Sequence, residues 1–295
     1  MRLPLTLIVA NRALSAPLNI HNDHSDSMGA RDAGFIQLYC ENNQEAYDNT
    51  IMAVKIAERA NIPVMVCYDG FITSHSVENI MLIETEDVKK FVGERKPLQY
   101  LLDDERNISM GPMDLQKYYF EHRKQLADAM RGAKDIIKEI SEEFYQLTGR
   151  KYDLFENYMM DDAELGIVIL NSTAGTAKDA VDELRKNGVK AGLLKPRAFR
   201  PLPYNEIPEQ LKNLKALAIL DKCDSVNGYA APLFTELTSA MYSKGLTVPT
   251  VNYIYGLGGV DVKVDDILEV YKKLNEISKN GNVDGKTTYY LGMEN

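Results

Sequence analysis

The sequence is poor in several features, and each shortage excludes a class of protein. Among 295 residues there are only three cysteines, widely spaced and without a CxxC pair: Cys40, Cys67 and Cys223. Such a count fits a reducing cytoplasm, where disulfides are rare. It also excludes an iron–sulfur cluster held by this chain alone, which needs four thiolates. No stretch approaches about 20 consecutive apolar residues, so the sequence predicts no membrane-spanning helix.

Positive charge is also scarce. The chain has 34 lysines and arginines against 43 aspartates and glutamates, which gives a formal net charge of −9 at pH 7. A nucleic-acid groove needs clustered basic residues, so this balance argues against a nucleic-acid partner. Neither an internal repeat nor a low-complexity tract is present, and the length suits one large or two medium domains.

The first 95 residues alternate between short apolar runs and one amphipathic stretch. Three runs predict buried strands: LPLTLIVA, GFIQLYCEN and IPVMVCYDG. Residues 42–61 predict a helix with Asn42 as N-cap and Glu45 closing a capping box. This order is typical of a parallel sheet covered on both faces, in which ligands bind beyond the carboxyl ends of the strands.

A second alternation begins near residue 152, after a connecting stretch and a long helix predicted over residues 114–147. The apolar stripe of that helix is expected to run from Leu115 through Tyr118 or Tyr119 to Phe144. Strands are predicted at LGIVILNS, VKAGLLKPR, ALAILDK and PTVNYIYGLGG, with helices between them. We therefore predict an α/β fold with two self-contained parallel-sheet domains, residues 1–150 and 151–295.

Polar side chains gather at two of the predicted strand ends. Arg12 ends the first strand, and the following loop adds His21, Asp23, His24 and Asp26. The third strand ends in DGFITSH, which supplies Asp69, Thr73, Ser74 and His75. A guanidinium can bind a carboxylate through two parallel hydrogen bonds, which favours a substrate role for Arg12. A salt bridge to Asp23, Asp26 or Asp32 explains this arginine equally well.

Simpler interpretations compete for the other motifs. Two histidines and two aspartates within residues 21–26 suggest a metal site, but they lack the i, i+4 spacing of helical ligands. We expect no metal there, and a loop that positions charges around an anion or a partner chain. A polar turn is favoured over a hydrolase at Ser74 and His75, because no GxSxG motif is present. KPRAFRP (195–201) is a cationic turn that could bind an anion or contact an acidic partner, but a solvated turn is the commoner case and is the one predicted here. GLGG (256–259) predicts a flexible loop.

Five motifs together resemble the alpha subunit of pyruvate:ferredoxin oxidoreductases: RLPLTLIVANRALSAPLNIHNDHSD, MGARDAGFIQLYCENNQEAYD, IPVMVCYDGFITSH, RAFRPLP and YGLGGVDV. Their order matches, and the resemblance covers essentially the whole chain. It implies an incomplete thiamine-diphosphate pyrimidine-type domain, then a domain like the C-terminal domain of transketolase. It also implies a cytoplasmic heteromer of anaerobic metabolism that converts pyruvate and coenzyme A to acetyl-CoA, CO2 and reduced ferredoxin.

The resemblance also assigns cofactors and partners. Thiamine diphosphate would be shared with other chains, while Mg²⁺ and the iron–sulfur clusters would lie on beta-, gamma- and delta-type subunits. The family's first domain begins well before NRALSAP, with a glutamate that activates the aminopyrimidine, a threonine near the substrate and the first strands. A split gene, a misassigned start or a truncation would each account for the difference. The isolated chain is therefore expected to be inactive.

The resemblance finally implies residue roles. Arg12 matches the arginine that binds the substrate carboxylate. An active-site loop or a subunit interface would contain His21, Asp23, His24, Asp26, Thr73, Ser74 and His75. Two alternatives stay open: a subunit of a branched-chain 2-oxoacid:ferredoxin oxidoreductase, and a non-catalytic assembly or binding subunit.

Overall fold

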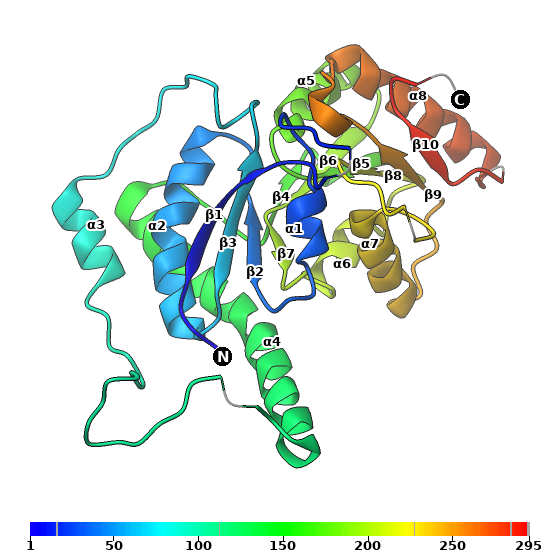
Figure 1. Cartoon of the computed structure of the whole chain (residues 1–295). Helices are drawn as coiled ribbons and strands as arrows, with labels where there is room; N and C mark the ends of the chain where they lie inside the picture. The colour runs from blue at the N-terminus through cyan, green and yellow to red at the C-terminus, as the bar shows by residue number, and fades with distance from the viewer. Residues whose placement is uncertain (16, 112, 227, 284, 294–295) are drawn as a thin grey trace.

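Two mainly parallel β-sheets form the framework of the chain (Figure 1). The computed structural model describes residues 1–15, 17–111, 113–226, 228–283 and 285–293. Within these residues, four strands pair in the order β1-β3-β2-β7, and six in the order β10-β9-β8-β5-β6-β4. The predicted α/β class with two parallel-sheet units is thereby confirmed, while the division at residue 150 stays a prediction.

The first sheet contains one strand from the second half of the chain. Its members are β1 (Thr6–Asn11), β3 (Val64–Asp69), β2 (Ile36–Tyr39) and β7 (Ala198–Arg200). The first three run parallel, as predicted. Strand β7 is antiparallel to β2 and pairs Arg200 with Gln37. The expectation that the second half is self-contained is wrong in this respect, because its RAFR segment completes the first sheet.

Strand β1 lies at the edge of the first sheet and, among the described residues, pairs only with β3. Apolar side chains are accessible there: Leu5, directly before the strand, is 53% exposed, and Leu7 and Ile8 within it are 39% and 45% exposed. An apolar edge strand with unpaired backbone groups readily pairs with another segment. This edge is therefore a surface on which further strands can be added.

Helices α2 (Asn43–Ala60) and α4 (Gln116–Thr148) pack together over one face of the first sheet. Asn42 caps α2 as predicted, because its side chain accepts a hydrogen bond from the backbone N–H of Glu45. The Glu45 carboxylate, however, accepts from the N–H of Glu41 and not from Asn42. The predicted capping box is therefore only half formed. A further helix, α3 (Thr85–Val92), lies in the stretch expected to be a connection.

The amino-terminal part of α4 is largely uncovered. Tyr118, Tyr119 and Phe120 are exposed, whereas fully buried positions on this helix begin at Ala133. The apolar stripe predicted from Leu115 is therefore wrong over its first turns. The helix extends beyond the sheet there, as Figure 1 shows, so the sheet does not cover these apolar side chains.

The second sheet contains two strands that the sequence did not predict. Its members are β4 (Phe155–Tyr158), β5 (Leu165–Ile169), β6 (Ala191–Pro196), β8 (Ala216–Asp221), β9 (Thr250–Ile254) and β10 (Thr288–Tyr290). Strand β4 is antiparallel to β6, and the other pairs are parallel. Strands β4 and β10 were missed, and so was helix α8 (Val264–Asn280), which follows the strand expected to be the last.

The two sheets share a core. Helices α5 (Thr173–Lys186) and α8 cover the outer face of the second sheet. Between the sheets lie α1 (Ser25–Gly29), α6 (Glu206–Leu211) and α7 (Pro232–Ser243), packed against side chains from both. This arrangement brings the carboxyl ends of strands from both sheets together. No helix in the described ranges has the length and apolar character needed to cross a membrane.

Candidate functional site

A buried polar cluster joins the carboxyl ends of the two sheets, and Asp69, the last residue of β3, lies at its centre. One carboxylate oxygen of Asp69 is 2.8 Å from Nε2 of His24 and accepts a hydrogen bond from Nδ2 of Asn171 at 3.2 Å. The other accepts from Nζ of Lys222 at 2.8 Å and from the hydroxyl and the N–H of Ser172. A single carboxylate thus links the loop after β1 to the ends of β5 and β8.

The charged groups of this cluster are buried, and their opposite charges offset one another. Asp69, His24 and Lys222 are each at most 2% exposed. Burial raises the pKa of Asp69, but the adjacent Lys222 and His24 outweigh burial, so this pKa lies well below its usual range. Asp69 and Lys222 form a buried, hydrogen-bonded ion pair. Losing either partner would therefore leave an uncompensated charge in the interior.

Asp26 fixes the start of the loop after β1. One of its carboxylate oxygens accepts from the side chain of Asn11 at 2.7 Å and from the N–H of Ser27 at 2.6 Å. The other accepts from the backbone N–H of Arg12 at 2.9 Å. Asp26 therefore holds the main chain of Arg12 and forms no salt bridge with its guanidinium. Ala16, in the NRALSAP motif, lies outside the described residues.

The guanidinium of Arg12 has no polar partner among the described residues. Its Nε is buried and lacks a hydrogen bond, and the group pairs with no carboxylate among the described residues. The planar group lies 5.4 Å from the ring centroid of Phe71, within the range of a cation–π contact. A cation that is half-buried and unpaired can accept an anion at low desolvation cost, because part of its hydration is already lost.

The three polar residues of FITSH, in the turn after β3, differ in how far they are buried. The main-chain carbonyl of Asp69 accepts from the N–H groups of Thr73 and Ser74 at 3.0 and 3.1 Å, which closes the turn. Thr73 is buried, whereas His75 is exposed. The hydroxyl of Ser74 accepts from the N–H of Phe71 at 2.9 Å and lies 2.7 Å from Nδ1 of His75. These contacts stabilise the turn itself.

The loop after β1 packs against the GLGG segment, which was expected to be a flexible loop. Asn19 donates a hydrogen bond to the carbonyl of Gly258 at 3.3 Å. A Cβ at Gly259 would lie 2.7 Å from Cβ of His21, closer than real contacts allow. Asp23 accepts from the N–H of Ser25 within the same loop. The glycines therefore permit a close approach, and His21 lies at the contact between the two halves.

The KPRAFRP segment is buried, so the prediction of a solvated turn is wrong. Arg197 is 3% exposed and donates hydrogen bonds to Asn49, to Ser141 and to the carbonyl of Asp153. Arg200 pairs with Glu236 at 2.6 Å. These cations stabilise the junction of the two sheets, and their partners come from remote parts of the chain.

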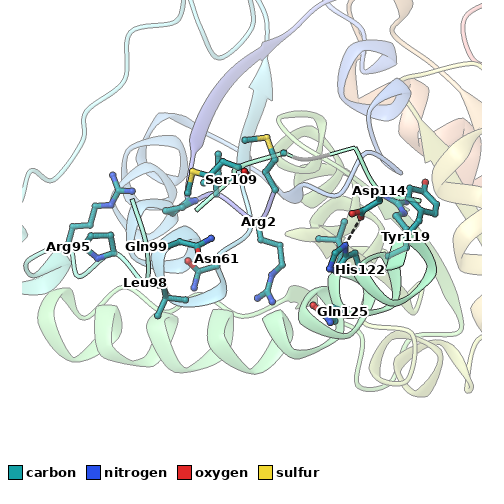
Figure 2. A pocket seen from close by; sticks show the side chains of 18 residues that line it. Arg2, Asn61, Arg95, Leu98, Gln99, Ser109, Asp114, Tyr119, His122 and Gln125 are labelled. Atoms are coloured by element: carbon teal, nitrogen blue, oxygen red, sulfur yellow. Dashed lines mark hydrogen bonds and ion pairs between the residues drawn. The ribbon is translucent and has the colours of Figure 1, made fainter. Parts of the chain in front are cut away.

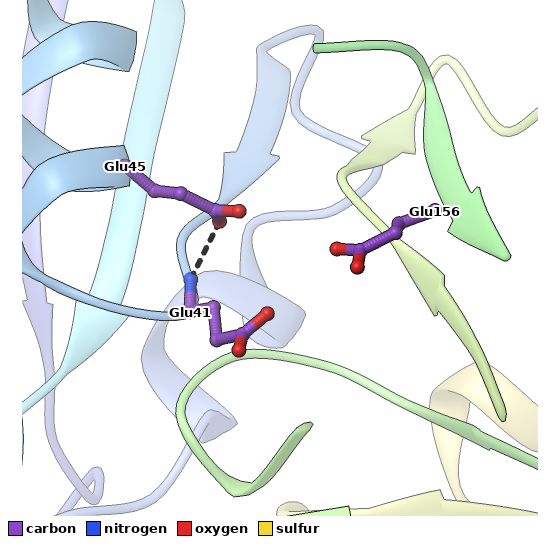
Figure 3. A group of neighbouring side chains, drawn as sticks. All are labelled: Glu41, Glu45 and Glu156. Carbon is purple, nitrogen blue, oxygen red and sulfur yellow. Dashed lines mark hydrogen bonds between the residues drawn. The ribbon is translucent and has the colours of Figure 1, made fainter. Parts of the chain in front are cut away.

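Three glutamates near this segment have a geometry that could hold a metal ion. Figure 3 shows Glu41, Glu45 and Glu156 facing one another, with carboxylate oxygens within 4.8 Å. Nζ of Lys195 lies 2.6 Å from Glu41, 2.6 Å from Glu45 and 2.8 Å from Glu156. Burial lowers the pKa of Lys195, but these three glutamates outweigh burial and raise it above its ordinary value. Nζ of Lys178 also lies 2.8 Å from Glu41 and 2.8 Å from Glu156, so two ammonium groups offset most of the negative charge of this cluster.

The candidate metal ligands of the loop at residues 21–26 are similarly occupied. Nε2 of His24 faces Asp69 and Asn171, and both oxygens of Asp26 accept hydrogen bonds from the chain. That the loop organises charges and does not ligate a metal stays a prediction.

A cavity of about 670 Å³ lies elsewhere, between the first residues of the chain, residues 95–111 and α4. Figure 2 shows Arg2, Arg95 and Tyr119 around it, with His122 facing Asp114. None of the predicted site residues lines this cavity. Arg12 is eight residues further along the chain than Pro4, which is about 25 Å along an extended strand. The cavity is therefore separate from the polar cluster.

Sequence reasoning missed three members of the cluster: Asn171, Ser172 and Lys222. Asn171 and Ser172 follow β5, and Lys222 follows β8. Their position at the carboxyl ends of parallel strands was the available signal, since ligands of such sheets bind at these ends. The sequence could not indicate that these ends face those of the first sheet.

Comparisons with known proteins assign both halves to one family. Residues 1–142 match the family described as "Pyruvate flavodoxin/ferredoxin oxidoreductase, thiamine diP-bdg". Residues 163–267 match "Pyruvate:ferredoxin oxidoreductase core domain II". The first half is therefore a domain of the thiamine-diphosphate-binding type.

Curated relatives align over almost the whole chain. Pyruvate synthase subunit PorA of Thermotoga maritima is 48% identical over 99% of this chain and 74% of its own length. Ketoisovalerate oxidoreductase subunit VorA of Pyrococcus abyssi is 39% identical over 98% of this chain and 73% of its own length. Both relatives are subunits, and both extend beyond the aligned region.

A solved structure shares the fold. The 2-oxoglutarate:ferredoxin oxidoreductase of Magnetococcus marinus superposes with a TM-score of 0.64 at 15% identity, covering 92% of this chain and 49% of that chain. Two matched family regions and a relative at 48% identity leave no competing assignment. The chain belongs to the pyruvate flavodoxin/ferredoxin oxidoreductase family, as an alpha-type subunit related to PorA.

Proposed function

We propose that the chain is the alpha-type subunit of a cytoplasmic, thiamine-diphosphate-dependent pyruvate:ferredoxin oxidoreductase. The observation that supports this most directly is the unpaired guanidinium of Arg12, fixed at the meeting edge of the two sheets. A 2-oxoacid presents a planar carboxylate, which a guanidinium binds through two parallel hydrogen bonds. The family assignment favours binding of a substrate carboxylate by Arg12 over a structural salt bridge.

The proposed reaction converts pyruvate and coenzyme A to acetyl-CoA and CO2. The bond between the carboxylate carbon and the carbonyl carbon breaks, and the acetyl group forms a thioester with coenzyme A. The two electrons of the broken bond reduce two one-electron ferredoxins, and the thiol proton is released; iron–sulfur clusters on partner subunits would carry these electrons. Arg12 orients the carboxylate before it leaves, which is a positional contribution.

Two other predicted site residues position the main chain around Arg12. Asp26 holds its main chain, and His24 anchors the same loop to Asp69. We assign these two residues an organising role. His21, Asp23, Thr73, Ser74 and His75 belong to the same loops, and we assign them to the active-site border or to a subunit contact.

The described residues fit the substrate carboxylate better than they fit the cofactor. Asp26 and Asp69, the carboxylates near Arg12, already accept hydrogen bonds at both oxygens. The Glu41–Glu45–Glu156 group pairs with Lys195 and Lys178. Each of these five carboxylates is therefore already engaged by groups of this chain. We therefore propose that thiamine diphosphate is shared with other chains, and that beta-, gamma- and delta-type subunits carry Mg²⁺ and the clusters.

The exposed edge of β1 is the proposed contact for part of that assembly. Leu5, Leu7 and Ile8 are accessible, and one side of the strand lacks a partner in the described structure. An additional strand would satisfy the backbone groups and cover the apolar side chains. This contact would also bring further residues close to Arg12.

Reconstitution tests the proposed function. The chain is combined with the beta-, gamma- and delta-type subunits, and reduction of ferredoxin is followed spectroscopically with pyruvate and coenzyme A. We expect reduction that requires both substrates and this chain. Reduction at the same rate without this chain would reject the proposal, and so would an assembled complex that releases no CO2 from pyruvate.

The isolated chain should not bind thiamine diphosphate tightly. The diphosphate of the cofactor needs Mg²⁺ and the second side of the binding cleft, both of which we assign to partner chains. Titration calorimetry with thiamine diphosphate and Mg²⁺ is expected to show no binding to the chain alone, and binding once its partners are present. A micromolar Kd for the isolated chain would mean that the cofactor site lies within these residues.

A branched-chain 2-oxoacid is the second candidate substrate, because VorA is also a relative. PorA of Thermotoga maritima is 48% identical to the chain and VorA of Pyrococcus abyssi 39%, which favours pyruvate. In the reconstituted complex, kcat/KM for pyruvate is accordingly expected to exceed that for 2-oxoisovalerate.

A further inference from the structure

Phe71 occupies an unusual conformation directly after the end of β3. Its φ angle is +58°, in the left-handed region that residues other than glycine seldom adopt. Such a conformation persists when neighbouring contacts determine it, and it is concentrated at functional sites. The hydroxyl of Ser74 supplies one of these contacts by accepting from the N–H of Phe71.

The ring of Phe71 lies in a stack of cationic and aromatic groups. His75 stacks on it with centroids 4.3 Å apart and an angle of 9° between planes. His21 approaches it at 4.7 Å in a tilted arrangement, and the guanidinium carbon of Arg12 lies 5.4 Å from its centroid. The bond between Ser74 and Nδ1 of His75 holds the stacking imidazole. The ring is thus fixed from several sides.

Gly70 makes the approach of Arg12 to this ring possible. A Cβ at Gly70 would lie 2.9 Å from Nε of Arg12 and 2.5 Å from the carbonyl oxygen of Asn11. The arginine side chain therefore passes directly over the main chain of the turn. Since the guanidinium forms no hydrogen bond with the described residues, the main chain of this turn and the ring of Phe71 are the contacts that limit where it can turn.

We propose that Phe71 is a positioning residue, which holds the guanidinium of Arg12 in the orientation that receives the carboxylate of the 2-oxoacid. This inference rests on the proposed function, because it assigns Arg12 to that carboxylate. An arginine side chain has several rotatable bonds, and ordering it only when substrate binds would weaken binding. The aromatic face supplies that order beforehand and leaves the hydrogen-bonding edge of the guanidinium free.

Steady-state kinetics of the assembled complex test this inference. Phe71→Leu keeps an apolar side chain but removes the ring face, and Phe71→Tyr retains it. For Phe71→Leu we expect KM for pyruvate to rise about five- to thirtyfold, with kcat changed less than about twofold. Phe71→Tyr should restore KM to near the wild-type value. Tyr242→Leu, at an exposed tyrosine on α7, is the matched control and should leave both constants unchanged.

Combining the substitution with Arg12→Ala separates positioning from a general structural effect. If Phe71 acts through Arg12, Phe71→Leu should not raise KM further once Arg12 is alanine. An equal rise in both backgrounds would overturn the inference, and so would an unchanged KM in Phe71→Leu beside a raised KM in Arg12→Ala. If Arg12→Ala itself leaves KM unchanged, the proposed role of Arg12 fails and this inference fails with it.

Discussion

Arg12→Ala is expected to lower kcat/KM for pyruvate about a hundredfold or more in the assembled complex, mainly by raising KM. A guanidinium that binds a carboxylate through two charge-assisted hydrogen bonds contributes about 3 kcal/mol, and this loss converts to that factor. Among the described residues, no lysine and no second arginine lies over the ring of Phe71 beside Arg12. Initial rates of ferredoxin reduction over a range of pyruvate concentrations give the two constants.

Arg12→Lys is the graded control. Lysine keeps the charge but loses the planar fork, so an intermediate effect of about tenfold is expected. KM for coenzyme A should stay unchanged in both variants, because Arg12 is assigned to the 2-oxoacid alone. A wild-type KM for pyruvate in Arg12→Ala, measured in a fully assembled complex, would remove this arginine from the substrate site.

Asp69→Asn should destabilise the chain by about 3–5 kcal/mol, because it leaves Lys222 as a buried cation without a counter-charge. Both side chains are at most 2% exposed, so solvent cannot compensate. The melting temperature, followed by circular dichroism on the purified chain, should fall by about 6–20 °C. The junction of the two sheets is expected to loosen with it, since Asp69 contacts Asn171 and Ser172 as well.

The difference in stability between the wild type and Asp69→Asn depends on pH because the pKa of Asp69 is lowered in the folded chain. A carboxyl with a lowered pKa stabilises the fold above its unfolded pKa of about 4, and this stabilisation is lost as the pH falls through the folded pKa. The free energy of unfolding of the wild type should therefore exceed that of Asp69→Asn at neutral pH. The difference between the two should decrease only below about pH 4. Asp69→Asn/Lys222→Met should recover part of the lost stability. A double variant less stable than Asp69→Asn would show that the buried cation is not the cause.

Local patterns were sufficient to predict much of the framework. The strands ending at Asn11, Asp69 and Asp221 are short apolar runs followed by polar residues, and such runs predict buried parallel strands. The position of Arg12 at a strand end followed from the same rule. Its assignment to a substrate carboxylate came from the resemblance to a family, because an arginine at that position fits a salt bridge equally well.

Long-range pairing accounts for what could not be predicted. Lys195 and Arg197 were expected in solvent because cationic runs usually are, but their partners Glu41, Glu45 and Asn49 lie about 150 residues away. Tyr118 and Tyr119 show the converse, since their helical spacing predicted burial and they are exposed. Periodicity indicates which face of an element is apolar. It does not indicate whether another element covers that face.

The pairing of β7 with β2 has a consequence for the order of events during synthesis. Gln37 cannot meet Arg200 until the ribosome has added the residues between them. At about 5–20 residues per second this takes about 8–30 seconds. During that interval β2 leaves the ribosome with one side unpaired. The nascent first sheet thus exposes its β2 edge, which a chaperone or an already finished partner subunit would protect at this stage.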